Sequence, residues 1–498
     1  MKKSNNSLKA IMAIIVIFLI FSIVLGVLMT TRQTNAPAID ESMGDAVSSA
    51  EQNISDSSSA DSDSISDKNS SESGDNSSQT EPAAEPTAEP TETAKPAETS
   101  SPVPTATAEP TPQPTAAPTK TPAPQPTQPP QIATSNDQLR AMWISYLEFQ
   151  SVDFSSKSAF TNQINQMFAN CADMGLNTVI VQVRPFGDAL YNSSVYPTSH
   201  LINGTQGTAL SFDPLAEMVN IAHSKGLRIE AWVNPYRVKL SSRMPANLAA
   251  SNPANDTSLV FNVDGGIYYN PCLSQVQDMV VKGIEEIVRN YDVDGIHLDD
   301  YFYPSTDMSL DADFYGASGS SLSQADWRRE NVNTLVRKIY SSIKSIDSTV
   351  TFGISPQGNN DNNYNVQYSD VNLWLREAGY VDYIMPQLYW GFGYLTQSGR
   401  DTYRFVNLSN QWASYPRHSS VKLHIGLGAY RIGAGDGGAN DQSEWSTGYN
   451  LMKQINALNA NSGISGFALY RYDNLFKNSE YASLAQSEVA HIKDILIG

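Results

Sequence analysis

From residue 140 onward, short apolar runs alternate with longer segments in which apolar side chains recur every three or four residues. The short runs are rich in Val, Ile, Phe, Tyr and Trp, which is typical of buried strands, whereas the longer segments have the period of amphipathic helices. The short runs predict eight β-strands, which cover residues 141–146, 177–184, 228–234, 294–301, 349–356, 381–390, 422–430 and 464–472.

Helix signals fall between these strands. Segments 160–175, 213–226, 274–291 and 325–346 have the helical period, several begin with Asp or Ser or end at Gly, and a last segment, 483–498, closes the chain. Eight strands, each followed by a helix, predict an α/β domain over residues 136–498 with the (β/α)8 fold of a TIM barrel. Active sites of this fold lie at the carboxyl ends of the strands.

The first 30 residues have a different pattern. Lys2, Lys3 and Lys9 precede an uncharged apolar run from Ala10 to Met29. A helix of that length spans about 30 Å of hydrocarbon, so residues 1–30 are expected to form an N-terminal transmembrane signal anchor, with the amino terminus inside the cell. The alternative is a signal peptide that is cleaved near residues 36–38, which read Ala-Pro-Ala.

Residues 31–135 lack the apolar side chains that a core requires. Residues 31–80 are rich in Ser, Asp, Glu and Asn, and residues 81–130 repeat Thr, Pro, Ala and Glu. This composition predicts a disordered Ser/Asp-rich and then Pro/Thr-rich linker, whose second part favours polyproline II and reaches on the order of 150 Å at about 3.1 Å per residue. We interpret the linker as a stalk that holds the barrel away from a membrane; the alternative is a docking tail for a proline-binding module.

Charge and cysteine content narrow the function classes. The chain has 51 acidic and 32 basic residues, a net charge of −19 and no basic cluster, so a nucleic-acid partner is not expected. Cys171 and Cys272 lie far apart, without a CxxC or Cys/His pattern, and are expected to be two buried thiols rather than a disulfide. No Walker loop, GxSxG or HExxH motif occurs, and we expect neither a metal nor a cofactor.

The stretch DGIHLDDYFYP, residues 294–304, leads an apolar run directly into two acids and three aromatic residues. Two acids after a short apolar run are often only a turn or a helix cap. At the end of a barrel strand, however, they would lie at the rim of a cleft. Because side chains alternate along a strand, we expect Asp299 to face the barrel interior with His297, and Asp300 to face outward.

Further polar and aromatic residues lie at inward positions or just beyond other strand ends. A single charged residue there is also explained as a structural ion pair, but many polar groups at one rim favour a site. Carboxylates can protonate a leaving oxygen, aromatic faces stack on sugar rings, and amides or Arg bind hydroxyl and acetamido groups. The candidate catalytic residues are Asp299, Asp300, Glu230 and Asp188, and the candidate substrate-binding residues are Gln182, Arg184, Trp232, Asn234, Tyr236, Arg237, His297, Tyr301, Tyr303, Gln387, Tyr389 and Trp390.

Six motifs in a fixed order resemble the glycosyl hydrolase-like 10 family. They read NTVIVQVRPFGDALYNSSVYPTSH, DPLAEMVNIAHSKGLRIEAWVNPYRV, VDGIHLDDYFYP, DWRRENVN, FGISPQG and VDYIMPQLYW, and the resemblance covers about residues 139–475. It implies a TIM barrel that hydrolyses glycosidic bonds, with bacterial members on the envelope, some of which act on peptidoglycan strands without stem peptides.

The same resemblance assigns roles to individual residues. It implies that Asp299 and Asp300 form the acidic centre and that the substrate is contacted by four residues, namely Asn234, Arg237, Gln387 and Tyr389. Members commonly have His where this chain has Glu230, which leaves open whether Glu230 is catalytic or replaces a binding His.

These observations lead to the hypothesis of a cell-envelope glycoside hydrolase that acts on peptide-free peptidoglycan strands. Asp299 is expected to be the main catalytic carboxylate, and Asp300, Glu230 or Asp188 the second; the separation of the two carboxyl groups would decide between retention and inversion. The chain is expected at the cell membrane as a single-pass protein with the barrel outside, or secreted if the anchor is cleaved. The alternatives are a glycan-binding protein without activity and a surface enzyme for another polysaccharide.

Overall fold

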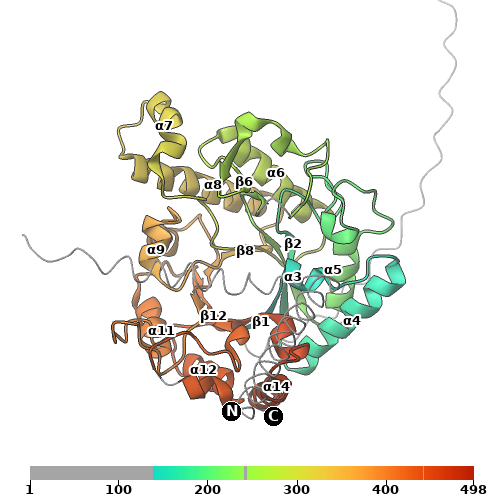
Figure 1. The fold of residues 1–498 in the computed structure, drawn as a ribbon, viewed down its shortest axis with the longest axis vertical. Coiled ribbons are helices and arrows are strands. Elements are labelled where there is room, and N and C mark those ends of the chain that lie inside the picture. Colours follow the sequence, from blue (N-terminus) through green and yellow to red (C-terminus); the bar gives the residue numbers. More distant parts are fainter. Residues whose placement is uncertain (1–137, 241–243, 441, 498) are drawn as a thin grey trace, which may run out of the picture. The chain divides into compact units, whose positions relative to one another are not determined.

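The computed structural model describes residues 138–240, 244–440 and 442–497 (Figure 1). The predicted anchor, residues 1–30, and linker, residues 31–135, lie outside these described residues. Within them, no helix combines the length and the apolar composition that crossing a membrane requires.

Each of the eight predicted segments contains at least one observed strand. All pairings within the main sheet are parallel. The strands of this sheet are β1 (Leu139–Ile144), β2 (Thr178–Arg184), β3 (Arg228–Val233), β7 (Gly295–Leu298), β8 (Thr351–Ile354), β9 (Tyr383–Ile384), β10 (Gln387–Leu388), β11 (Lys422–Leu423), β12 (Ile425–Gly428) and β13 (Gly466–Tyr470).

The main sheet curls until its two ends meet. Its order is β10-β12-β13-β1-β2-β3-β7-β8-β9-β11. β9 and β10 come from one predicted strand, which is interrupted at Pro386 because proline has no N–H for the ladder; β11 and β12 come from another, interrupted at His424. Since β9 pairs with β11 and β10 pairs with β12, the pairings continue round the sheet. The predicted α/β class and the parallel barrel-like sheet are therefore confirmed.

Helices follow the strands and surround the sheet (Figure 1). Capping residues set several of their starts: the side chain of Ser156 accepts from the Ala159 N–H at the start of α4, and Asp213 does the same for Ala216 at the start of α5. The helices are α3 (Tyr146–Phe149), α4 (Lys157–Asp173), α5 (Pro214–Ser224), α6 (Ser274–Asn290), α7 (Ala312–Ser318), α8 (Gln324–Ile346), α9 (Asn360–Asn365), α10 (Val371–Arg376), α11 (Phe405–Ser414), α12 (Asn450–Asn459), α13 (Tyr472–Phe476) and α14 (Ala482–Ile497).

One small sheet was not predicted from the sequence. β4 (Arg237–Lys239), β5 (Val260–Val263) and β6 (Gly266–Tyr269) form an antiparallel sheet in the connection between β3 and α6. Its strands have three or four residues each, which is too short for an alternating pattern to stand out. The sheet begins at Arg237, one of the candidate binding residues.

Alternate strand positions pack into two separate apolar groups. On β1, Met142 packs with Phe160 and other helix residues, whereas Trp143 packs with residues of other strands such as Trp232 and Tyr383. This is the two-residue period of a strand that is covered by helices outside and filled by side chains inside.

Glycines admit two large side chains to the barrel interior. A Cβ atom on Gly353 would lie 1.9 Å from the ring of Tyr383, and one on Gly295 would lie 2.8 Å from Cγ of Glu230. Both glycines are on strands next to the residue that they accommodate. The interior at this level is therefore filled by Glu230 and Tyr383.

Glu230 is fully enclosed below the strand ends. Oε2 accepts a hydrogen bond from the Tyr383 hydroxyl, and Oε1 accepts one from Thr351 Oγ1 at 3.3 Å. Burial raises the pKa of Glu230 from its ordinary 4.5 to about 7, against the opposing effects of the Tyr383 hydrogen bond and the charge of Arg228. The carboxyl group therefore gains a proton more readily in the folded chain than in the unfolded one.

This difference makes a prediction for Glu230→Gln. Because the pKa is raised on folding, the contribution of Glu230 to stability is complete below pH 4.5 and is lost as the pH rises through about 7. The pKa values of 4.5 and about 7 correspond to on the order of 3 kcal/mol. As the pH is raised from 5 to 8, we expect the unfolding temperature of the wild type to fall relative to that of Glu230→Gln. Circular dichroism measures both temperatures. Exposed Glu377→Gln is the control, and a difference independent of pH would contradict the prediction.

Candidate active site

Asp299 and Asp300 follow β7 directly and are both buried, with 2% and 6% of their surface exposed. The expectation that Asp300 faces outward is wrong. β7 ends at Leu298, so the alternation of side chains stops before the two acids. Both carboxyl groups instead bond to residues at the carboxyl ends of other strands, β3 for Asp299 and β10 for Asp300.

Asp299 is bound by two side chains at the end of β3. The indole nitrogen of Trp232 donates to Oδ2 at 3.1 Å, and the amide nitrogen of Asn234 donates to Oδ1 at 2.9 Å and to Oδ2 at 3.1 Å. Burial raises the pKa of Asp299 to about 6; the charge of Asp300 adds to this, while Arg237 and the two donors oppose it. Asp299 can therefore exchange a proton near neutral pH.

Asp300 is bound on the other side of the site. Nε2 of Gln387, on β10, donates to Oδ1 of Asp300 at 3.0 Å and to the backbone oxygen of Ser355 at 2.9 Å. Burial raises the pKa of Asp300, and hydrogen bonds from Gln387 and Gln357 oppose the rise. Ser355 and Gln357 were not among the candidates, although Ser355 is near the end of the predicted strand 349–356 and Gln357 directly follows it.

The turn after β3 connects Asp299 to Arg237. The side-chain oxygen of Asn234 accepts from the backbone N–H groups of Tyr236, at 3.3 Å, and of Arg237, at 2.8 Å. A guanidinium nitrogen of Arg184 donates to the backbone oxygen of Asn234. Asn234 thus fixes the turn with one end of its amide and Asp299 with the other.

Arg237 lies among aromatic rings at this rim. Its Nε donates to the backbone oxygen of Pro185 at 2.9 Å, and its guanidinium carbon lies 5.0 Å from the ring centre of Phe186 and 5.6 Å from those of Tyr146 and Tyr301. Tyr301 as a residue is 38% exposed, so it offers an aromatic surface next to the acids.

Three further candidates are buried in this turn or at the strand ends beside it. Gln182 accepts from the backbone N–H of Tyr146 at 3.0 Å, Arg184 stacks on Tyr196 at 4.1 Å from the ring centre, and Tyr236 is fully enclosed. Their contacts hold the strand ends and the turn in place.

His297 lies in the barrel interior and is neutral. The Trp143 indole N–H donates to Nε2 at 3.3 Å, and since this group can only donate, Nε2 is the acceptor. Nδ1 then carries the hydrogen and donates to the Tyr383 hydroxyl at 2.8 Å. Burial, with the charge of His424, lowers the pKa of His297 to about 3. The imidazole orients the side chains of Trp143 and Tyr383 in the interior and does not carry a proton to Asp299.

Two candidate acids do not join the pair. Glu230 precedes Asn234 by four residues on β3, about 13 Å along the strand, and binds Tyr383. Asp188 accepts from His200 Nδ1 at 2.7 Å and from Gln206 at 2.9 Å, within the connection between β2 and α5. The structure therefore brings Asp299 and Asp300 together without either of them.

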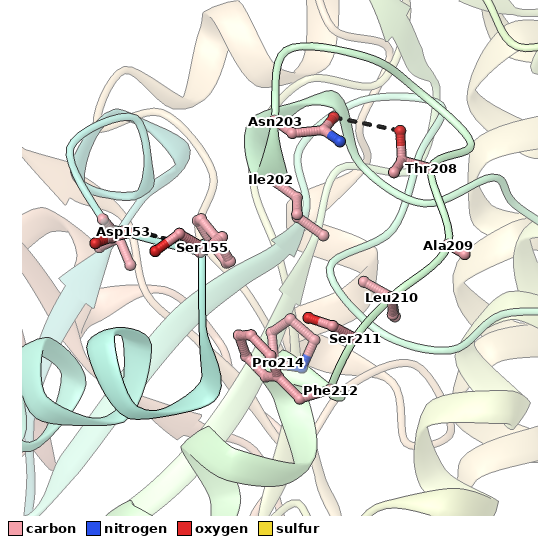
Figure 2. A pocket seen from close by; sticks show the side chains of 12 residues that line it. Asp153, Ser155, Ile202, Asn203, Thr208, Ala209, Leu210, Ser211, Phe212 and Pro214 are labelled. Atoms are coloured by element: carbon pink, nitrogen blue, oxygen red, sulfur yellow. Dashed lines mark hydrogen bonds between the residues drawn. The ribbon is translucent and has the colours of Figure 1, made fainter.

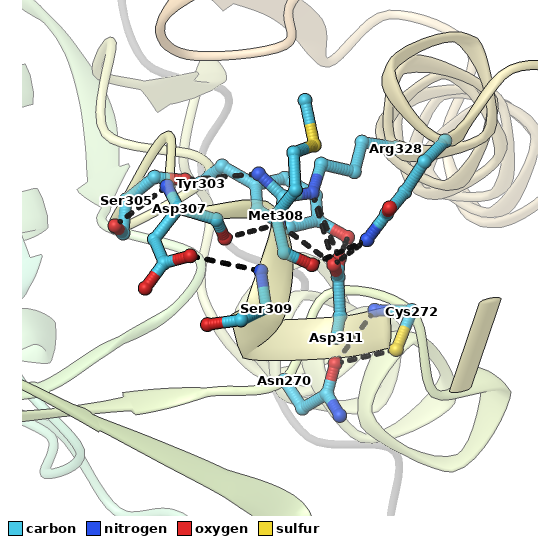
Figure 3. A network of polar contacts seen from close by, with 10 residues as sticks. Asn270, Cys272, Tyr303, Ser305, Asp307, Met308, Ser309, Asp311 and Arg328 are labelled. Carbon is cyan, nitrogen blue, oxygen red and sulfur yellow. Dashed lines mark hydrogen bonds and ion pairs between the residues drawn. The ribbon is translucent and has the colours of Figure 1, made fainter. Parts of the chain in front are cut away.

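Tyr303 belongs to a buried network that holds the chain after the acids (Figure 3). Its hydroxyl donates to Asp311 Oδ2 at 3.0 Å, and Asp311 is paired with Arg328 of α8 at 2.6 Å. Arg328 also donates to the backbone oxygens of Ser305, at 3.2 Å, and of Asp307, at 2.7 Å. Tyr303 thus has a role in fixing the segment that begins at the acid pair.

Tyr389 and Trp390 follow β10. The Tyr389 ring stacks on that of Tyr470, with centres 5.7 Å apart, and the Trp390 ring stacks on that of Tyr403, with centres 5.3 Å apart. Tyr389 is 4% exposed, whereas Trp390 is partly exposed. They form an aromatic region beyond β10, the strand that holds Asp300 through Gln387.

A cavity of about 430 Å³ lies elsewhere, between the loops that lead into α4 and α5 (Figure 2). Its walls include Phe154, Asn203, Thr208 and Phe212, and none of the candidate residues lines it. Within the described parts of the chain, no three His, Cys, Asp or Glu side chains gather as metal ligands would.

Comparisons with known proteins agree with the resemblance seen in the sequence. The family model for glycosyl hydrolase-like 10 matches residues 138–447. Glycosyl hydrolase YngK of Bacillus subtilis is 34% identical over 350 residues, which are 65% of this chain and 66% of that protein, just under two thirds of its length. Glycosyl hydrolase DigH of Escherichia coli K12 is 31% identical over 383 residues, which are 69% of this chain and 85% of that protein.

A solved structure is also similar. The PgaB (BpsB) glycoside hydrolase domain from Bordetella bronchiseptica aligns with 70% of this chain and 99% of its own chain, with 11% identity and a TM-score of 0.48. The extent of the family match and the identity to the two named relatives decide the classification. The chain belongs to the glycosyl hydrolase-like 10 family, whose named relatives here are glycosyl hydrolases.

Proposed function

We propose that this chain hydrolyses O-glycosidic bonds, with Asp299 and Asp300 as the catalytic acids. One observation carries the proposal: two buried carboxyl groups lie next to each other at a strand end, and each is held by donors from a different strand, β3 for Asp299 and β10 for Asp300. A structural ion pair would put a cation between them, but here both have raised pKa values and amide or indole partners.

The two acids have different surroundings and therefore different roles. Asp299, with a pKa of about 6, is the proton donor to the leaving oxygen, and it is protonated in about half of the molecules at pH 6 and in roughly a tenth at pH 7. Asp300, held by Gln387, stabilises the positive charge that develops at the sugar ring, or orients an acetamido group that takes part itself. The exposed ring of Tyr301 supplies a stacking surface for the sugar.

The substrate we propose is the glycan strand of peptidoglycan after its stem peptides have been removed. The family resemblance implies this substrate for some members, and the N-terminal sequence fits it. An apolar anchor at residues 1–30 and a long proline-rich linker would place the domain outside the cell at the cell membrane, within reach of a wall.

Replacing Asp299 tests the catalytic role. We expect Asp299→Asn to lower kcat on peptide-free peptidoglycan strands by on the order of 100- to 10,000-fold, because the proton donor is lost, while the strands still bind. Asp300→Asn should also lose turnover, and exposed Asp313→Asn is the control. Mass spectrometry of the released oligosaccharides measures the outcome, and a panel of other polysaccharides tests the alternative substrate. Binding without turnover in the wild type would favour the glycan-binding alternative.

Trp232→Phe tests which protonation state is active. Asp299 must be protonated to act as an acid, so activity should fall as the pH rises through about 6. The Trp232 N–H favours the ionised carboxylate, and its removal raises the pKa of Asp299. We expect the fall in kcat/KM to move to higher pH by up to about one pH unit. In the control, Trp445→Phe, the indole nitrogen that is lost has no partner among the described residues, so the profile should stay in place. A shift to lower pH in Trp232→Phe would contradict the assignment.

The proposed location at the cell membrane predicts that the chain is found in the membrane fraction. A helix of about 20 apolar residues keeps a protein in the bilayer when peripheral contacts are removed. The full-length chain should therefore stay with membranes washed at high pH, as detected by immunoblot, and externally added protease should reach its barrel. Release of the full-length chain by the wash would contradict the anchor, and a shorter chain in the medium would favour cleavage and secretion.

A further inference from the structure

Arg237 differs from the other buried arginines of the described chain in that neither terminal nitrogen of its guanidinium bonds to a described residue. Arg328 is paired with Asp311 at 2.6 Å. A terminal nitrogen of Arg184 donates to the backbone oxygen of Asn234, and one of Arg431 donates to that of Gly435. Arg237 is only 7% exposed, yet the one hydrogen bond of its side chain to a described residue runs from Nε to the oxygen of Pro185. Burying a charged guanidinium without an anionic partner lowers the stability of the fold. A ligand that supplies the anion when it binds would explain why Arg237 is placed here.

The two terminal nitrogens of Arg237 remain available. Neither bonds to a described residue, and neither belongs to the polar atoms that are both sealed from solvent and unpartnered. Arg184 makes a contrast, because its Nε and one terminal nitrogen are sealed while the guanidinium stacks on Tyr196. The free edge of Arg237 is thus open to a molecule that enters the site.

The acids next to Arg237 do not satisfy it. The charge of Arg237 opposes the raised pKa values of both Asp299 and Asp300, so it lies near them, but it pairs with neither. The oxygens of Asp299 already accept from Trp232 and Asn234. The planar fork of two N–H groups matches the two oxygens of a carboxylate, and a single carbonyl oxygen would use only half of it.

We infer that Arg237 binds a carboxylate on the substrate, so that the site selects an acidic sugar placed beside Asp299 and over the ring of Tyr301. This inference rests on the proposed function and specifies its substrate. In a peptide-free peptidoglycan strand, the lactyl group of each muramic acid residue ends in a free carboxylate. Where a stem peptide is attached, the same group is an amide and has no charge. Arg237 thereby discriminates between stripped and intact strands.

A substrate that lacks only this charge tests the inference. Peptide-free strands are compared with the same strands after the lactyl carboxylates have been converted to methylamides, using the full-length chain in detergent. We expect the conversion to lower kcat/KM of the wild type by on the order of 10- to 100-fold, which is typical of a lost charge-assisted hydrogen bond. Arg237→Gln should cleave both substrates at one low rate, because it no longer distinguishes them. Exposed Arg376→Gln should behave as the wild type does.

A second measurement uses the wild type alone and does not depend on the folding of a variant. Free N-acetylmuramic acid should inhibit cleavage more strongly than its methyl ester, which keeps the acetamido group. Equal cleavage of the two strands, equal inhibition by acid and ester, or a preference that persists in Arg237→Gln would overturn the inference and leave the proposed function intact. If the wild type cleaves neither strand, both the proposed function on this substrate and the inference fail.

Discussion

The geometry of the acid pair depends on one constraint, which is that a buried carboxylate needs hydrogen-bond donors within reach. For Asp299 these donors are Trp232 and Asn234, both at the end of β3. The parallel register of β3 and β7 places Trp232 opposite His297, two residues before the acid. A slip of one residue would turn Trp232 to the outer face and leave Asp299 buried without its donors. The hydrogen bonds that hold Asp299 therefore depend on the correct pairing of β3 and β7.

The same constraint organises the interior below the acids. Glu230 is held by Tyr383, Tyr383 accepts from His297, and His297 accepts from Ser355 at 2.9 Å. The backbone oxygen of Ser355 in turn accepts from Gln387, which binds the second acid of the pair. A continuous set of hydrogen bonds thus runs from the lower interior to the rim, and glycines on β7 and β8 leave room for its large members. Tight packing makes this set rigid, which keeps the acids in a fixed place.

The sequence predicts the strands and the acid stretch well, because both depend on local patterns that survive in the fold. Alternation along β1 and the run into Asp299 are such patterns. The direction of Asp300 was not predictable, since it depends on where β7 ends, and strand ends are set by tertiary pairing. Alternation gives the face on which Glu230 lies but not its depth in the barrel. The partners of Asp188 were not predictable either, because its loop folds back so that the carboxylate accepts from His200 and Gln206.

In the mechanism that we propose, proton transfer and substrate charge are coupled at this rim. With Asp299 protonated, Asp300 ionised and Arg237 charged, the three groups have no net charge, and an acidic sugar can enter without repulsion. As the pH rises through about 6, Asp299 ionises, the proton for the leaving oxygen is lost and the rim becomes negative. Catalysis and binding of an anionic sugar then weaken together. Asn234 holds Asp299 with its amide nitrogen and the Arg237 backbone with its oxygen, so one side chain sets the distance on which both depend.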